Sequence, residues 1–162
     1  PFVIGAIQEA KARGATTAGI TNNVGTTLEE LVELPIVVPT GPELIAGSTR
    51  LKAGTVQKVI LNMLSTAAMI SLGKVYDGFM VGLRANNEKL RRRAVRTLTA
   101  LTRQEPDMVK DMLAAADYEV DTALVMLTGN ITHDEAKRLL QKYRGNVRRT
   151  LETLEHGTTG RK

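Results

Sequence analysis

The sequence predicts an α/β fold: the second half of a doubly wound parallel sheet, followed by a small bundle of helices. Helix-like and strand-like segments alternate over the first 75 residues, which is the order of a doubly wound sheet. From Glu105 onward, short helical patterns follow one another without strands. We therefore divide the chain into an α/β part at 1–75, a linker with a basic helix at 76–104, a helical bundle at 105–157 and a tail at 158–162.

The α/β part alternates helices with apolar runs that are typical of buried parallel strands. Gly14 suits the C-terminal cap of the first helix, and Thr26 or Thr27 can cap the second, where Glu29 and Glu30 favour the helix dipole. In chain order we expect helix, strand, helix, strand and a long apolar helix at residues 2–13, 15–20, 27–32, 34–38 and 59–72.

The second part of the chain carries strong local signals for helix ends. Pro106 suits the first position of a helix, and Thr132 with Glu135 forms a capping box. We expect a short β-like segment, a basic helix and four short helices, at residues 79–83, 87–103, 106–113, 118–127, 132–143 and 147–154.

The composition excludes several kinds of site. The chain has no cysteine, which excludes thiol catalysis and thiolate metal sites. It has two histidines, His133 and His156, so a His-rich metal site is excluded as well. We interpret His133 as a first-turn helix residue and His156 as an exposed residue near the tail. Apolar runs fall short of the ~18 residues of a membrane span, so we expect no membrane partner and, by default, a cytoplasmic protein.

The positive charge of the chain is concentrated in one helix. The formal net charge is +5, and the segment from Arg84 to Arg103 contains many basic residues but only one acid, Glu88. Such a helix could meet nucleic acid. It lacks aromatic residues between the cations for stacking on bases, so we interpret it as a solvated face and expect no nucleic-acid partner.

The stretch 41–58 is the best candidate for a binding site. It begins as a Gly/Pro turn after a predicted strand and ends as a helix, which is where open α/β sheets bind ligands. Between Leu34 and Val75 the only acid is Glu43, whereas Arg50, Lys52, Lys58 and Lys74 are basic. The N–H groups of a helix's first turn also suit anions, so the stretch predicts an anionic ligand.

The helix of this stretch has a polar stripe. At ~100° per residue its polar side chains fall within an arc of roughly 80°, namely Ser48, Lys52, Thr55, Asn62 and Thr66. The other faces are apolar, and a helix that is apolar on most sides is usually buried. Two interpretations stay open at this point: a ligand-binding ridge, or a buried helix with one solvated edge and a Ser48 cap.

The same residues carry a resemblance to a known family. The run Gly-Ser-Thr-Arg-Leu-Lys-Ala-Gly-Thr-x-Gln-Lys at 47–58, followed by Leu-Asn-Met-Leu-Ser-Thr at 61–66, resembles the signature of the N-acetylmuramic acid 6-phosphate etherases. The glucokinase regulatory proteins share much of it, and both belong to the sugar isomerase (SIS) phosphosugar-binding superfamily. Residues 1–6 and 80–90 resemble flanking family segments. The chain departs from the family at Val56, Gly82 and Asn86, where Ala, Asp and Thr are usual.

The resemblance implies an enzyme, a carbon–oxygen lyase. The etherases cleave the D-lactyl ether of N-acetylmuramic acid 6-phosphate to N-acetylglucosamine 6-phosphate and D-lactate, by elimination and then hydration, without a cofactor. The family's acid and base glutamates and its two phosphate turns lie in the half that this chain lacks. We therefore interpret the chain as a C-terminal fragment, assign no catalytic residue in it and expect the fragment alone to be inactive.

The resemblance also implies partners and site residues. We expect a phosphorylated amino sugar as ligand and a homodimer as the assembly. The candidate substrate-binding residues are Glu43, Ser48, Thr49, Lys52, Thr55, Lys58 and Asn62. We expect Glu43 to contact sugar hydroxyls or to pair with Lys52 or Arg50. The sequence pattern at 136–147 resembles that of ubiquitin-associated-type helical bundles. We interpret the bundle of this chain as a structural element, or as a dimer or lid element. The alternative function is a non-catalytic phosphosugar sensor of the glucokinase-regulator type.

Overall fold

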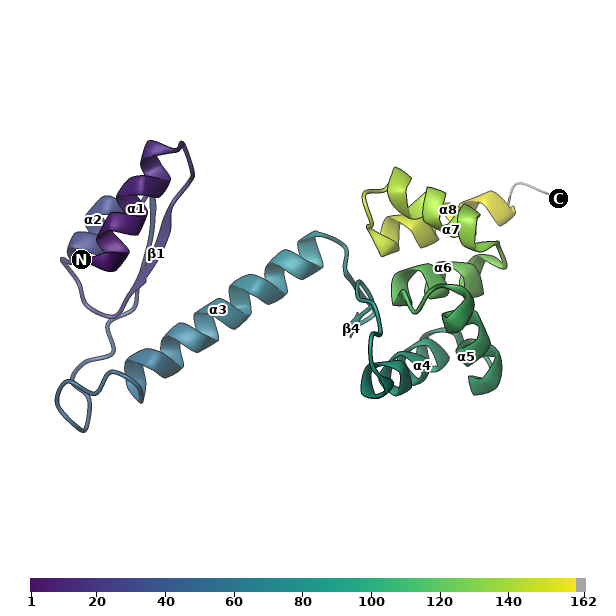
Figure 1. Cartoon of the computed structure of the whole chain (residues 1–162), viewed down its shortest axis with the longest axis horizontal. Coiled ribbons are helices and arrows are strands. Elements are labelled where there is room, and N and C mark those ends of the chain that lie inside the picture. The colour runs from purple at the N-terminus through teal and green to yellow at the C-terminus, as the bar shows by residue number, and fades with distance from the viewer. Residues whose placement is uncertain (160–162) are drawn as a thin grey trace. The chain divides into compact units, whose positions relative to one another are not determined.

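The computed structural model describes residues 1–159, with side chains as far as Leu154 (Figure 1). The chain divides into two compact units, Pro1–Ser65 (unit 1) and Thr66–Lys162 (unit 2). The fold is α/β with a small parallel sheet, as the sequence predicts. None of the described helices combines the length and the apolar character that crossing a membrane requires.

Unit 1 is a small parallel sheet with helices. Its elements are α1 (Phe2–Ala12), β1 (Ala18–Thr21), α2 (Thr27–Leu31), β2 (Leu34–Val37) and the larger part of α3 (Lys52–Ser71). The two strands pair in parallel, with Ala18 opposite Leu34 and Thr21 opposite Val37. Helix α2 packs on both strands and against α1, which Figure 1 shows. The predicted order of elements is confirmed, although β1 begins three residues later than the apolar run.

A glycine lets α2 approach the sheet closely. A Cβ added to Gly19 of β1 would lie 3.1 Å from the side chains of Leu28 and Val32. Thr26 caps α2 by accepting a hydrogen bond from the backbone N–H of Glu29, at 3.2 Å. The contact and the cap together fix α2 on the strands.

The apolar core of unit 1 is small. Val32 and Ala53 are its only buried apolar residues, and Ala53 is the only buried residue of α3. The interpretation of α3 as a helix buried on most sides is wrong for this chain. Burial needs apolar surface opposite the helix, and the strands and helices of unit 1 leave Leu61, Met63 and Leu64 at least half exposed.

As far as residue 159, unit 2 contains the end of α3, a hairpin and five further helices. The hairpin pairs β3 (Val75–Tyr76) with β4 (Phe79–Met80) in antiparallel fashion. Asp77 and Gly78 connect them at positive φ, as a type I′ turn requires. The helices are α4 (Glu88–Thr102), α5 (Pro106–Ala115), α6 (Val120–Gly129), α7 (His133–Lys142) and α8 (Val147–Thr159). Helix α8 extends beyond the predicted end at Leu154, so residues 158–159 are helical and not tail, whereas 160–162 lie outside the described residues.

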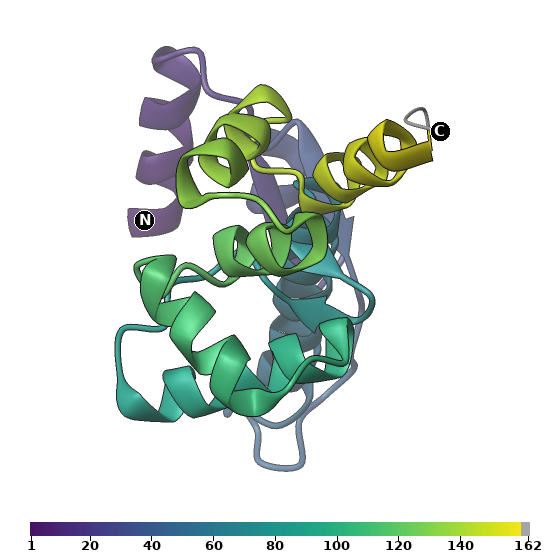
Figure 2. The same cartoon turned by 90° about the vertical axis from the view of Figure 1, so that its right-hand side faces the viewer.

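The helices of unit 2 enclose an aliphatic core. Its largest fully buried side chains include Leu98, Leu113, Leu124, Leu151 and Val109. Helix α6 lies at the centre and packs against α4, α5, α7 and α8. Figures 1 and 2 both show α6 between α7 and the α4–α5 pair. Unit 2 therefore buries its apolar side chains within itself.

Candidate functional site

The two strands of unit 1 end at the same edge of the sheet. Because β1 and β2 are parallel, Thr21 and Val37 both lie at their carboxyl ends. Asn22 follows β1 directly, is nearly fully buried, and donates a hydrogen bond from Nδ2 to the carbonyl of Val38, at 3.0 Å. This side chain ties the two strand ends together.

Helix α3 contacts this carboxyl edge through Gln57. Its Nε2 donates a hydrogen bond of 2.6 Å to Oδ1 of Asn22, which is 35 residues earlier in the chain. The start of α3, and with it the motif at 47–58, therefore lies at the edge where open α/β sheets bind ligands. The Thr-Asn-Asn turn that follows β1 thus has a contact far along the chain. Sequence reasoning did not single out Gln57, although Gln57 lies inside the motif.

Glu43 occupies the N-terminus of α3. Its carboxylate accepts hydrogen bonds from the backbone N–H of Lys52, at 3.0 and 3.1 Å, and of Ala53, at 3.1 Å. The Lys52 ammonium donates to the carbonyl of Pro42, at 2.9 Å. A carboxylate is favoured here by the orphan N–H groups and the helix dipole.

This geometry corrects three expectations. The first-turn N–H groups of α3 are not free for an external anion, because Glu43 uses two of them. Glu43 contacts the backbone of Lys52 rather than its ammonium, and Ser48 does not cap the helix, which begins at Lys52.

The candidate binding residues are accessible to solvent. Ser48 and Glu43 are half-buried, whereas Thr49, Lys52, Thr55, Lys58 and Asn62 are exposed. Within residues 1–154, several of their side chains make no hydrogen bond or ion pair, namely those of Ser48, Thr49, Thr55, Lys58 and Asn62. These polar groups are therefore available to a ligand.

A second polar cluster lies in unit 2. Lys74 Nζ lies 3.6 Å from Asp121 Oδ2, and Lys137 Nζ lies 2.6 Å from Glu119 Oε2. The hydrogen bond from Lys137 lowers the pKa of Glu119 below its ordinary value. Burial raises the pKa of the Asp121 carboxyl above its ordinary value. The two pairs join α6 to the hairpin and to α7.

Lys74 also explains the glycine at position 82. A Cβ at Gly82 would clash with Cδ of Lys74, so the lysine side chain uses the space that a side chain at 82 would fill. Lys74 crosses Gly82 and reaches Asp121.

His133 is the first residue of α7, as its position after the Thr132 cap predicts. Its Nδ1 lies 3.2 Å from Oδ1 of the neighbouring Asp134. The side chain of His156 lies outside the described residues.

A polar, cationic helix start at the carboxyl edge of a parallel sheet defines the class: an α/β protein with the geometry of a ligand-binding edge. Curated relatives narrow this class to one family. The chain is 44% identical over 152 residues to an N-acetylmuramic acid 6-phosphate etherase of Geobacillus thermodenitrificans, which covers 94% of this chain and 52% of the relative. It is 46% identical over 151 residues to the etherase of Streptomyces avermitilis, covering 93% and 49%.

The etherase of Mycolicibacterium smegmatis is 45% identical over 148 residues, covering 91% of this chain and 50% of the relative. No family model matches the chain. The chain spans about half the length of the curated relatives it matches. It is a homologue of the N-acetylmuramic acid 6-phosphate etherases over the half that it spans.

Proposed function

We propose that this chain is part of an N-acetylmuramic acid 6-phosphate etherase, a lyase of cell-wall sugar recycling. The observation that carries the proposal is the 44% identity with the Geobacillus thermodenitrificans etherase over 94% of this chain. The position of the motif supports it, because Gln57 and Asn22 hold the start of α3 at the carboxyl edge of the sheet. The substrate would be N-acetylmuramic acid 6-phosphate, and the products N-acetylglucosamine 6-phosphate and D-lactate.

The role of this chain in the reaction would be binding. Elimination of lactate requires a base at carbon 2 of the open-chain sugar, and acid assistance at the leaving oxygen, each within hydrogen-bond reach. Glu43, the acid of the motif, is engaged by two backbone N–H groups of α3, so we assign it a structural role and no proton transfer. Ser48, Thr49 and Lys52 would bind sugar hydroxyls and phosphate oxygens, with Thr55, Lys58 and Asn62 beside them.

The exposed apolar side chains of α3 support a further part of the proposal. Soluble monomers rarely expose large contiguous apolar patches, which often mark interaction surfaces. Val59, Leu61, Met63 and Leu64 are each at least half exposed. We infer that these exposed sides of α3 pack against the rest of an SIS domain or a second copy in a homodimer. The helices α4–α8 would form the additional bundle, and the enzyme would work in the cytoplasm.

The test is release of D-lactate from N-acetylmuramic acid 6-phosphate. The chain expressed with the coding sequence that precedes Pro1 should release D-lactate, and the 162-residue chain alone should not. Turnover by the chain alone would overturn the assignment of the acid and base to another part of the enzyme.

The same assay separates the enzyme from a sensor. A sensor of the glucokinase-regulator type would bind the phosphosugar and leave its ether intact. Saturable binding without D-lactate, measured on the longer protein, would contradict the etherase proposal and favour the sensor.

A further inference from the structure

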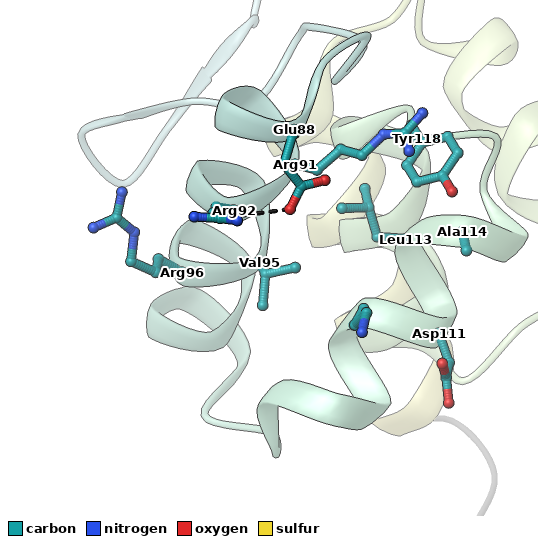
Figure 3. Close-up of a pocket in the computed structure, with 10 residues that line it drawn as sticks. Glu88, Arg91, Arg92, Val95, Arg96, Asp111, Leu113, Ala114 and Tyr118 are labelled. Atoms are coloured by element: carbon teal, nitrogen blue, oxygen red, sulfur yellow. Dashed lines mark hydrogen bonds and ion pairs between the residues drawn. The ribbon is translucent and has the colours of Figure 1, made fainter.

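A pocket of about 770 Å³ lies between α4 and α5 in unit 2 (Figure 3). Figure 3 shows Val95 of α4 and Leu113 of α5 pointing into the space between the two helices. Ala114 adds a small exposed side chain to the wall. The volume falls in the range of about 300–1,000 Å³ that is typical of small-molecule sites.

One end of the pocket is closed by a fixed aromatic pair. The Arg91 guanidinium lies 3.7 Å from the centroid of the Tyr118 ring, a cation–π distance. Arg91 Nε also donates to the carbonyl of Ala85, at 3.3 Å. Both interactions hold Arg91 in place, as Figure 3 shows for the ring contact. This end is therefore a wall and not an opening through which an extended chain would pass.

The charges around the pocket are unbalanced. Four basic residues and two acidic residues line it, which leaves a formal excess of two positive charges. Glu88 neutralises Arg92 at 3.0 Å. Asp111, the other acid, points away from Val95 in Figure 3.

Two cations of the lining remain without a partner. Among the described side chains, neither Arg96 nor Lys110 makes a hydrogen bond or an ion pair. They come from different helices, Arg96 from α4 and Lys110 from α5. Figure 3 shows the Arg96 guanidinium on the side of α4 that faces away from α5. Lys110 is therefore the unpaired cation that the pocket offers to an anion with an apolar body.

We propose that the α4–α5 pocket binds a small organic anion with an apolar body. The anionic group is attracted by Lys110, and the apolar body lies against the half-buried Val95. We assign the pocket a binding role. It is a second ligand site, separate from the proposed phosphosugar site in unit 1, and its test does not depend on that function.

Three probes separate charge from apolar contact. 1-Naphthalenesulfonate carries both features, 1-naphthalenemethanol has the same aromatic body without the charge, and methanesulfonate has the anionic group without the body. Each is titrated into the full 162-residue chain and followed by amide chemical shifts. We expect naphthalenesulfonate to shift the amides of residues 88–96 and 110–118, and each of the other two to bind at least about fivefold more weakly.

Matched variants locate the site. Lys110→Gln removes an unpaired cation. Ala114→Glu adds a negative charge, which repels the sulfonate, at an exposed residue of the pocket wall. Both substitutions should lower the affinity for naphthalenesulfonate by about two- to fivefold. Lys89→Gln, on the same α4 helix but outside the pocket lining, should leave the affinity unchanged.

Four results would overturn the proposal. If naphthalenemethanol bound as tightly as naphthalenesulfonate, the charge would play no part in binding. If methanesulfonate bound as tightly as naphthalenesulfonate, the apolar contact would play no part. An equal effect of Lys89→Gln and Lys110→Gln would indicate diffuse attraction to a basic helix. Tighter binding of an acidic peptide than of naphthalenesulfonate at the same amides would make this a peptide-docking surface.

Discussion

The two units of this chain differ in where their apolar side chains lie. Unit 2 buries a continuous aliphatic core around α6, with Leu124 and Leu98 almost inaccessible to water. Unit 1 buries only Val32 and Ala53 among its apolar residues, and most of the exposed large apolar side chains of the chain belong to it. Yet unit 1 carries the motif at 47–58, which resembles the etherase signature. The unit with the candidate binding site is thus the one whose core is incomplete.

The difference indicates what each unit requires. Parallel sheets are usually covered on both faces, and a sheet of two strands offers little surface for a helix of 20 residues such as α3. The relatives are about twice the length that this chain spans. We infer that unit 1 acquires its missing core from another polypeptide segment, whereas unit 2 holds its own fold.

The largest expected effect comes from a matched pair of leucines. Leu124→Ala in unit 2 should reduce the free energy of unfolding by about 2–5 kcal/mol, because it removes buried methyl groups and leaves a cavity. Leu61→Ala on α3, where the side chain is 56% exposed, should change it by no more than about 0.5 kcal/mol. Urea unfolding of both variants measures the contrast, and equal losses would show that α3 is covered in this chain.

The next effect concerns the contact that holds α3 at the sheet. Asn22→Ala should cost about 1–3 kcal/mol, since it leaves the Val38 carbonyl and Gln57 without their partner. Asn23→Ala, an exposed neighbour, serves as the control. A double-mutant cycle of Asn22→Ala with Gln57→Ala should give a coupling free energy above zero. Strict additivity of the two changes would mean that the contact does not position α3.

A smaller effect is expected at the start of α3. Glu43→Ala removes a cap and should cost about 1 kcal/mol of local helix stability, which corresponds to about fivefold faster amide exchange. Hydrogen exchange at Lys52 and Ala53 measures it. Exchange at Leu98, in the buried part of α4, should not change. Unaltered exchange at Lys52 and Ala53 would show that Glu43 does not cap the helix.

The smallest effect is a pH dependence in unit 2. Lys137 lowers the pKa of Glu119 in the folded protein, so the folded state binds fewer protons than the unfolded state in the window between the two pKa values. The stabilisation is present above the unfolded pKa and is lost as the pH falls through the folded pKa. Glu119→Gln should therefore cost up to about 1 kcal/mol at pH 7 and nothing in strong acid.

The control for this titration is Glu152→Gln, an exposed carboxylate, which should behave like the parent chain throughout. A Glu119→Gln difference that persists unchanged into strong acid would show that the Lys137 pair does not stabilise unit 2. For Asp121 the sign is reversed, because burial raises its pKa. Its contribution is present below the unfolded pKa and is lost as the pH rises through the folded pKa.

Local signals in the sequence predicted the helix ends well. Thr132 forms the capping box of α7, as expected, and the basic helix begins next to Asn87, which caps it, because such signals depend on residues within one turn. Long-range contacts could not be predicted in this way. Gln57 meets Asn22 across 35 residues, and Glu43 caps a helix nine residues away. The sequence did not predict the exposure of α3, because an apolar helix pattern leads to burial only where a partner surface is present.

The most direct test of the account compares two lysines, one in each unit, on the chain expressed with the coding sequence that precedes Pro1. The dissociation constant for N-acetylmuramic acid 6-phosphate should rise at least about tenfold in Lys52→Gln, because a charged hydrogen bond is worth about 1.5–3 kcal/mol. It should be unchanged in Lys110→Gln. Loss of affinity in Lys110→Gln with Lys52→Gln unaffected would place the sugar phosphate in unit 2 and contradict the account.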